Sequence, residues 1–67
     1  MSPKRLGRML KTIREQKGLS QRGLAAKAKT TGAYIAQIEG GARKNPSIAV
    51  LQRLAKALGV PVTELLG

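Results

Sequence analysis

The chain has 67 residues, of which 13 are Lys or Arg and only three are Asp or Glu, so its formal net charge is +10. It contains no Cys and no His, which excludes disulfides, zinc sites, and thiol or imidazole catalysis. The three glutamates are too scattered to form a hydrolytic pair of carboxylates. We therefore predict no enzyme activity, no metal and no cofactor, and the charge indicates a polyanionic partner, nucleic acid first.

The length predicts one small domain over residues 1–67, which buries about 60% of its unfolded surface. Its apolar runs span only a few residues, whereas a membrane span needs about 20. The N-terminal sequence also lacks the apolar segment of a signal peptide. We expect a cytoplasmic protein without a membrane partner.

Residues 4–17 are predicted to form a first helix that Pro3 starts and Gly18 ends. Apolar residues recur at the helical period, namely Leu6, Met9, Leu10 and Ile13. Arg14 lies at the border of this stripe, beside the expected core. The opposite face is basic, and it either meets a polyanion or is only a solvated surface.

The segment 20–41 contains two short helical patterns separated by a polar break. Ser20 is predicted to cap a helix over 21–28, which buries Leu24, Ala25 and Ala28. After the break, Thr31 caps a helix over 32–39 with Ile35 and Ile38 on its buried face. The opposite face carries small or amide side chains, namely Gly32, Ala33, Ala36 and Gln37. Two such helices in a basic chain match the DNA-binding helix-turn-helix, whose second helix enters the major groove.

The remaining residues are predicted to form a loop and two more helices. Residues 40–46 have the Gly and Asn-Pro content of a loop, in which Arg43 and Lys44 are expected to meet phosphate. Ser47 is expected to cap a fourth helix with an apolar stripe of Ile48, Leu51, Leu54, Ala55 and Leu58. A last helix over 60–66 begins near Pro61, and its Leu65 and Leu66 either close the core or face a partner.

The chain resembles the phage repressor and Cro-like helix-turn-helix family, also called the Xre family, over essentially its whole length. The resemblance rests on these runs: Gly18-Leu19-Ser20-Gln21, Leu24-Ala25, Tyr34-Ile35, Ile38-Glu39, Asn45-Pro46-Ser47 and residues 54–60. It implies an all-α, lambda-repressor-like domain of five helices that binds double-stranded DNA as a homodimer. It also implies a buried ion pair between Arg14 and Glu39, in agreement with the position of Arg14 beside the apolar stripe.

The resemblance and the residue pattern together predict roles for individual residues. Base contacts are expected at the small and amide positions of the recognition helix, namely Gly32, Ala33, Ala36 and Gln37. DNA backbone contacts are expected at Gln21, Arg22, Tyr34, Arg43, Lys44 and Asn45, and dimer contacts at Val62, Leu65 and Leu66. Gln37 is suited to contact adenine, because its amide can bond N6 and N7 of that base together. The alternative is that Gln37 is a surface amide without a role in binding. Tyr34 reaches a phosphate or simply packs at the helix edge.

The sequence departs from the usual pattern of the family in three ways. Gly23 stands where Glu is usual, which removes the partner of the Ser20 cap and weakens the helix. Lys29 stands where Gly is usual, so a left-handed turn there costs about 1 kcal/mol or more. Gly32 and Ala33 replace polar residues, which removes two hydrogen-bonding groups from the base-reading surface.

The sequence therefore predicts a transcriptional regulator, a repressor that binds a palindromic operator. A phage or plasmid repressor, a restriction-modification controller and an antitoxin that also binds a toxin remain open. From another class, a basic adaptor or coactivator would use the same fold chiefly for protein contacts. A membrane-surface peptide and an RNA-binding platform are disfavoured, the first by the single compact core and the second by the absence of Trp and Phe.

Overall fold

Five helices form the computed structural model, which describes residues 2–43 and 46–66. In order, they are α1 (Pro3–Gln16), α2 (Gln21–Ala28), α3 (Gly32–Glu39), α4 (Ile48–Leu58) and α5 (Thr63–Leu66). No strand occurs within these two ranges. The all-α prediction with five helices is thus confirmed, and no helix of the described ranges is long and apolar enough to span a bilayer.

A hydroxyl side chain caps the start of each of the first four helices. In each case the oxygen accepts the backbone N–H three residues further on, at 2.9 to 3.1 Å, in the pairs Ser2–Arg5, Ser20–Gly23, Thr31–Tyr34 and Ser47–Val50. These bonds satisfy donors that have no partner inside a helix. The caps Ser20, Thr31 and Ser47 match the sequence prediction, whereas Ser2 caps α1 in front of the expected Pro3.

The turn between α2 and α3 depends on one strained residue. Lys29 has φ +57° and ψ +48°, in the left-handed region that favours glycine, as its position predicts. The next N–H, that of Thr30, donates to the carbonyl of Ala25 at 2.9 Å and closes the end of α2. The chain therefore passes from α2 to α3 through a single left-handed residue.

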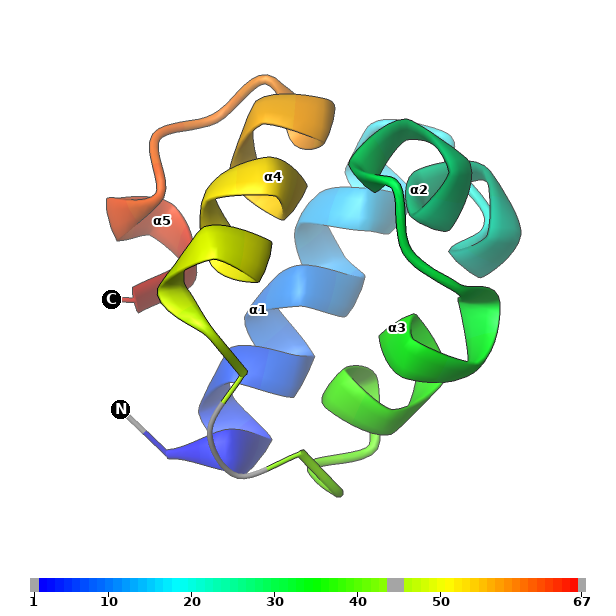
Figure 1. Ribbon diagram of the computed structural model, residues 1–67. Coiled ribbons are helices and arrows are strands. Elements are labelled where there is room, and N and C mark those ends of the chain that lie inside the picture. Colours follow the sequence, from blue (N-terminus) through cyan, green and yellow to red (C-terminus); the bar gives the residue numbers. More distant parts are fainter. Residues whose placement is uncertain (1, 44–45, 67) are drawn as a thin grey trace.

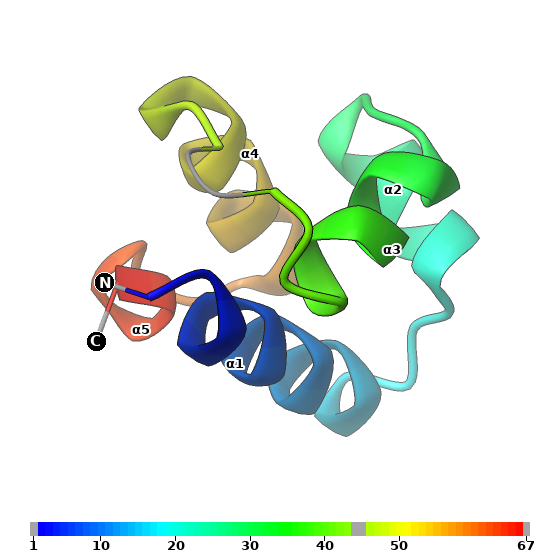
Figure 2. The ribbon, with the colours of Figure 1, turned by 90° about the horizontal axis from the view of Figure 1, so that it is seen from below.

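The core lies between α1, the helix-turn-helix and α4, and α5 closes it at the N-terminal end of α1 (Figures 1 and 2). Its largest fully buried side chains come from all five helices: Leu6, Leu10, Leu24, Ile35, Ile38, Leu51, Leu54 and Leu65. Nearly all of them were predicted from helical periodicity. With 67 residues, this single cluster supports only a narrow margin of stability.

Two apolar residues differ from their predicted positions. Ile48 was expected in the core stripe of α4, but its side chain is 59% exposed. It is the first residue of α4 and lies at the edge of the stripe that Leu51, Leu54 and Leu58 define, so the core does not reach it. Met9, expected on the buried stripe of α1, is only partly buried.

The last helix is shorter than predicted, and its two leucines differ. It begins at Thr63 rather than near Pro61. Leu65 is 2% exposed and belongs to the core, whereas Leu66 is 37% exposed. Neighbouring residues on a helix point about 100° apart, so only one of the two leucines faces inward. The monomer itself buries Leu65, so this side chain has almost no surface left for the predicted dimer contact.

Candidate nucleic-acid interface

The helix α3 has an inner face in the core and an outer face open to solvent. Ile35 and Ile38 on the inner face are both 0% exposed. The outer face consists of Ala33, Ala36 and Gln37, whose side chains are all exposed. These three residues were predicted to contact bases, and the structure leaves them accessible to a ligand.

Gly32 and Arg22 lie together at the front of α3. A Cβ atom added at Gly32 would lie 3.4 Å from Cγ of Arg22, an ordinary van der Waals distance. Gly32 is partly buried for this reason, and the first turn of α2 covers one side of it. The structure thus brings one predicted base contact beside one predicted backbone contact.

A buried ion-pair network fixes the inner side of the helix-turn-helix. Arg14 Nε donates to Glu39 Oε2 at 2.6 Å and Arg14 Nη2 donates to Oε1 at 3.0 Å, with the two side chains 9% and 5% exposed. Arg14 Nη1 also donates to the carbonyl of Leu19 at 2.7 Å, and Gln21 Nε2 donates to Glu39 Oε1 at 3.1 Å. Hydrogen bonding to Glu39 raises the pKa of Arg14 above its already high usual value. The network joins α1, the loop after it, α2 and the end of α3.

Gln21 takes part in this network as well as being a predicted phosphate contact. One amide N–H is used on Glu39, and a primary amide has a second one. Its side chain is therefore held in place at the start of α2, at the edge of the outer surface.

Arg43 lies across two residues of the recognition helix. Its Nε donates to Gln37 Oε1 at 2.9 Å, and its Cζ lies 4.7 Å from the centroid of the Tyr34 ring. Tyr34 is partly buried, so it packs at the helix edge with its ring covered by a cation. Lys44 and Asn45, also predicted to contact the DNA backbone, lie outside the described residues.

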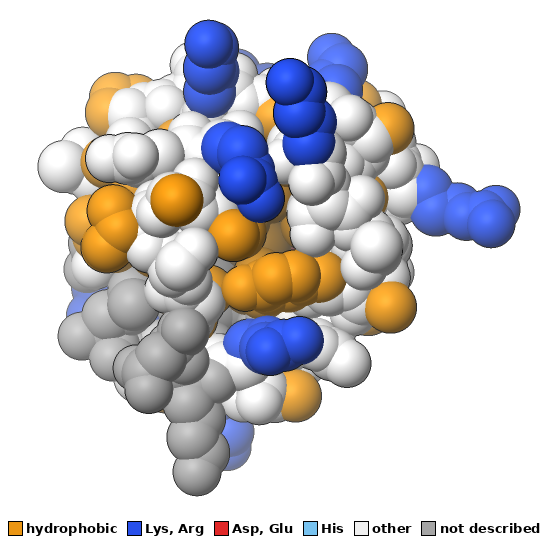
Figure 3. Space-filling view, in the orientation of Figure 1, with side chains coloured by type: hydrophobic (Ala, Val, Ile, Leu, Met, Phe, Trp, Pro, Cys, Tyr) orange, Lys and Arg blue, Asp and Glu red, His pale blue; other side chains and the backbone are white. Residues whose placement is uncertain are grey.

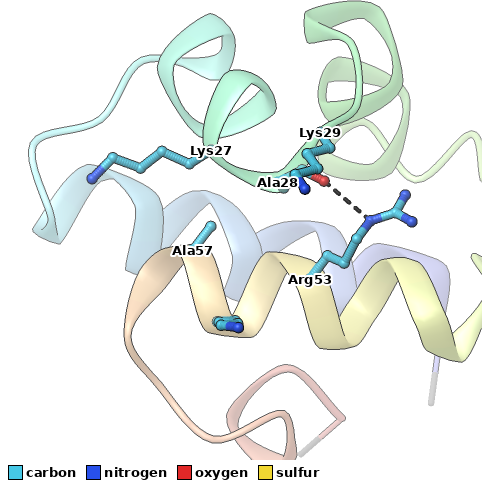
Figure 4. Close-up of a pocket in the computed structure, with 6 residues that line it drawn as sticks. Lys27, Ala28, Lys29, Arg53 and Ala57 are labelled. Carbon is cyan, nitrogen blue, oxygen red and sulfur yellow. Dashed lines mark hydrogen bonds between the residues drawn. The ribbon is translucent and has the colours of Figure 1, made fainter.

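A second group of cations was missed by sequence reasoning. A hollow of about 510 Å³ between α2 and α4 is lined by Lys27, Ala28, Lys29, Arg53, Lys56 and Ala57 (Figure 4). Arg53 Nε donates to the carbonyl of Ala28 at 3.1 Å, and the other N–H groups of the guanidinium have no partner among the described residues. Basic side chains, and no acidic one, are visible on this face in Figure 3. The residues come from two helices that are distant in sequence, so only the tertiary structure assembles them.

Sequence reasoning also missed Gly7 in the middle of α1. An added Cβ atom there would lie 2.4 Å from the carbonyl oxygen of Ile38 and 2.7 Å from that of Glu39. Any side chain would push α3 away from α1 and disturb the ion pair with Arg14. A glycine inside a helix costs about 1 kcal/mol relative to alanine, so a glycine within the predicted first helix indicates a reason for its presence, such as close packing.

The capped helix pair, the left-handed turn and the exposed second helix define a helix-turn-helix domain. The chain belongs to the helix-turn-helix family HTH_3, whose pattern matches residues 10–65. The sequence resemblance and the fold class are thereby confirmed.

Two relatives illustrate the similarity in sequence. The chain is 40% identical over 62 residues to the immunity repressor protein of Bacillus phage phi105, covering 92% of this chain and 42% of that protein. It is 38% identical over 61 residues to the transcriptional regulator SinR of Bacillus subtilis, covering 91% and 55% respectively. The chain thus spans about half the length, or less, of these curated relatives.

Solved structures show the same architecture. The restriction-modification controller protein C.AhdI from Aeromonas hydrophila has a TM-score of 0.90 and 35% identity, with 94% of each chain covered. The biofilm regulator SinR, solved in complex with DNA, has a TM-score of 0.89 and 37% identity, with 92% of this chain and 98% of that chain covered. Both similarities cover more than nine-tenths of this chain.

Proposed function

We propose that the chain binds double-stranded DNA through the outer face of α3 and regulates transcription as a repressor. The observation that carries this proposal is the exposed, uncharged outer face on a helix whose inner end is fixed by a buried ion pair. A fixed helix with an accessible face is what docking into a major groove requires. The relatives support the same function, since they include an immunity repressor and a regulator solved with DNA.

Base edges are read from Ala33, Ala36, Gln37 and Gly32 in this proposal. The alanines contact thymine methyl groups, and Gln37 is the one side chain of the outer face with directional hydrogen bonds. The DNA backbone is held by Gln21, Arg22, Tyr34 and Arg43, together with Lys44 and Asn45. The cations of the hollow between α2 and α4 add to the same positive field.

We also propose a two-fold homodimer on DNA. The large exposed apolar side chains of the described ranges are Ile48, at the start of α4, and Leu66, at the end of α5. With Val62, which is partly buried, they offer apolar surface that a second copy would cover. Two recognition helices would then lie about 34 Å apart and read half-sites one DNA turn apart.

Selection of bound sequences from a random duplex pool tests the proposal. We expect a palindrome whose half-sites are about 10 base pairs apart, bound by two protomers in analytical ultracentrifugation. Affinity should fall with salt with a log–log slope of roughly −5, as for about six phosphate contacts. A pool without an enriched sequence, or an affinity independent of salt, would contradict DNA regulation.

A second function is favoured by one observation, the scarcity of hydrogen-bonding groups on the outer face. Ala33 and Ala36 cannot donate or accept through their side chains, so an adaptor with mainly protein contacts would use this fold equally well. An antitoxin that binds a toxin belongs to the same alternative. Uniform binding to all duplexes, combined with tight binding of a protein partner in the same operon, would select this function over the repressor.

A further inference from the structure

The chain folds back over α3 directly after that helix ends. Gly41 has φ +77°, a left-handed conformation that glycine adopts without strain. The N–H of Gly41 donates to the carbonyl of Ile38 at 3.0 Å, and that of Ala42 donates to the carbonyl of Gln37 at 2.9 Å. These bonds form a closed helix end of the Schellman type, which returns the next residue, Arg43, toward the outer face.

Arg43 then contacts two residues one turn apart on α3. Tyr34 and Gln37 are three positions apart, so their side chains neighbour each other on the helix surface. The Arg43 guanidinium lies over the ring of Tyr34 at 4.7 Å and bonds the amide of Gln37 at 2.9 Å. We call these three side chains the Arg43 clamp.

The clamp determines which end of the Gln37 amide is free. A guanidinium has only donors, so its bond to Gln37 must be accepted by the amide oxygen. The amide nitrogen, with two N–H donors, is left for a ligand. Four further N–H groups of Arg43 lie beside it, and the carboxylate of Glu39 is engaged by Arg14 and Gln21. Among the described side chains, the groups that the clamp offers to a ligand are therefore mainly N–H donors.

Donors on the protein select acceptors on the base. Guanine shows two acceptors in the major groove, N7 and O6, whereas adenine shows one acceptor and one amino donor. An adenine amino group at Gln37 would have to approach an oxygen already bonded to a cation. A free glutamine reads adenine by accepting from N6 and donating to N7. Arg43 occupies one lone pair of the amide oxygen, so an adenine amino group would have to share this oxygen with a cation, whereas both N–H donors of the amide stay available.

We propose that Arg43 acts as a specificity-determining residue that turns Gln37 from an adenine reader into a guanine reader. The inference rests on the proposed function, since it concerns the bases that α3 contacts. It replaces the sequence expectation of adenine at Gln37. The preference for guanine over adenine at that base pair should be about 5- to 150-fold, the range for a bidentate contact.

The contact itself is testable in the protein without DNA. In nuclear magnetic resonance spectra, Arg43→Ala should shift the Gln37 side-chain amide signals, while Arg5→Ala should not. Arg5 is a matched control, because it is an exposed arginine that loses the same charge on α1. Unchanged Gln37 amide signals in Arg43→Ala would overturn the clamp.

The base preference is tested by selection from a duplex pool with four proteins. Gln37→Ala identifies the base pair, since its preference disappears there. Wild type and Arg5→Ala should select guanine at that pair, and Arg43→Ala should lose this preference and move toward adenine. Adenine in wild type, or guanine retained in Arg43→Ala, would overturn the inference. A wild-type pool without any enriched sequence would overturn the proposed function and the guanine assignment together, while the amide spectra would still decide whether the clamp exists.

Discussion

The inner and outer faces of α3 differ in how firmly their side chains are held. On the inner face, Ile35 and Ile38 are fully buried and Glu39 accepts three hydrogen bonds. On the outer face, the only side-chain bond among the described residues is that between Gln37 and Arg43, and it is exposed to solvent. Stability therefore depends on one side of the helix, and selection of a ligand depends on the other.

This difference teaches how a small domain keeps recognition adaptable. With 67 residues the total stability is marginal, so every inner contact matters. Exposed substitutions away from special features usually change stability by less than about 0.5 kcal/mol. Outer residues are thus free to change with the DNA sequence, provided that the inner face stays intact.

The largest expected effect is at the ion pair. Glu39→Ala leaves Arg14 buried without its partner, which typically costs about 3–5 kcal/mol and should largely unfold the domain. Thermal unfolding followed by circular dichroism measures it. Glu64→Ala, an exposed acid on α5, is the control for charge and should melt almost like wild type. A near-normal melting temperature for Glu39→Ala would show that the inner face does not depend on the pair.

The next largest effect on stability is expected at two glycines that pack differently. Gly7 lies against the end of α3, and Gly32 lies beside Arg22 of α2. Gly7→Ala forces a Cβ to within 2.4 Å of a carbonyl oxygen, so α1 and α3 must separate at a cost of about 1–3 kcal/mol. Gly32→Ala meets only ordinary contacts and should be neutral or stabilising by up to about 1 kcal/mol. Urea denaturation of both variants tests the contrast, and equal effects would refute it.

The outer face should affect binding without affecting stability. Gln37→Ala is expected to lose about 1–3 kcal/mol of discrimination at its own base pair and little on random DNA. Its urea midpoint should equal that of wild type, because the side chain is exposed. Equal weakening on specific and random duplexes would instead make Gln37 a backbone contact.

The smallest effect concerns the turn that joins the two helices. Lys29→Gly removes the left-handed strain and should stabilise the fold by roughly 0.5–1 kcal/mol. It also removes one cation from the hollow between α2 and α4, so binding to all duplexes should weaken slightly. Lys29→Asn loses the same charge but adopts the left-handed conformation less readily than Gly. It should therefore weaken DNA binding as much as Lys29→Gly does, while it stabilises the fold less. A loss of stability in Lys29→Gly would contradict the strain.

Features set by local chemistry were accessible from the sequence. The caps at Ser20, Thr31 and Ser47 are predicted because each hydroxyl residue directly precedes a segment with helical spacing of apolar residues. The left-handed conformation of Lys29 is predicted from its position in the turn. The exposed outer face of α3 is likewise predicted from the helical spacing of its apolar residues. The ion pair was indicated by the position of Arg14 at the border of its stripe and by the family resemblance.

Features set by tertiary contact were not accessible. The core buries Leu65 and not Leu66, which depends on how α5 is rotated about its own axis. A helix of four residues is too short for its sequence to show this rotation. Gly7 matters only because α3 passes over it, and the Arg43 clamp forms only because Gly41 turns the chain back. In each case the deciding neighbour is remote in sequence or depends on the exact backbone path.

The glycine of α1 also sets how closely two helices can approach. A Cβ atom built at Gly7 would lie 2.4 and 2.7 Å from the carbonyl oxygens of Ile38 and Glu39, so α1 and the end of α3 meet here without a side chain between them. The Ile38 carbonyl also accepts the N–H of Gly41, which begins the turn that carries Arg43 back toward α3. A genetic screen for suppressors of Gly7→Ala should consequently recover changes at the end of α3 and in the loop after it, so the sequence of the first helix would constrain that of the loop that carries Arg43.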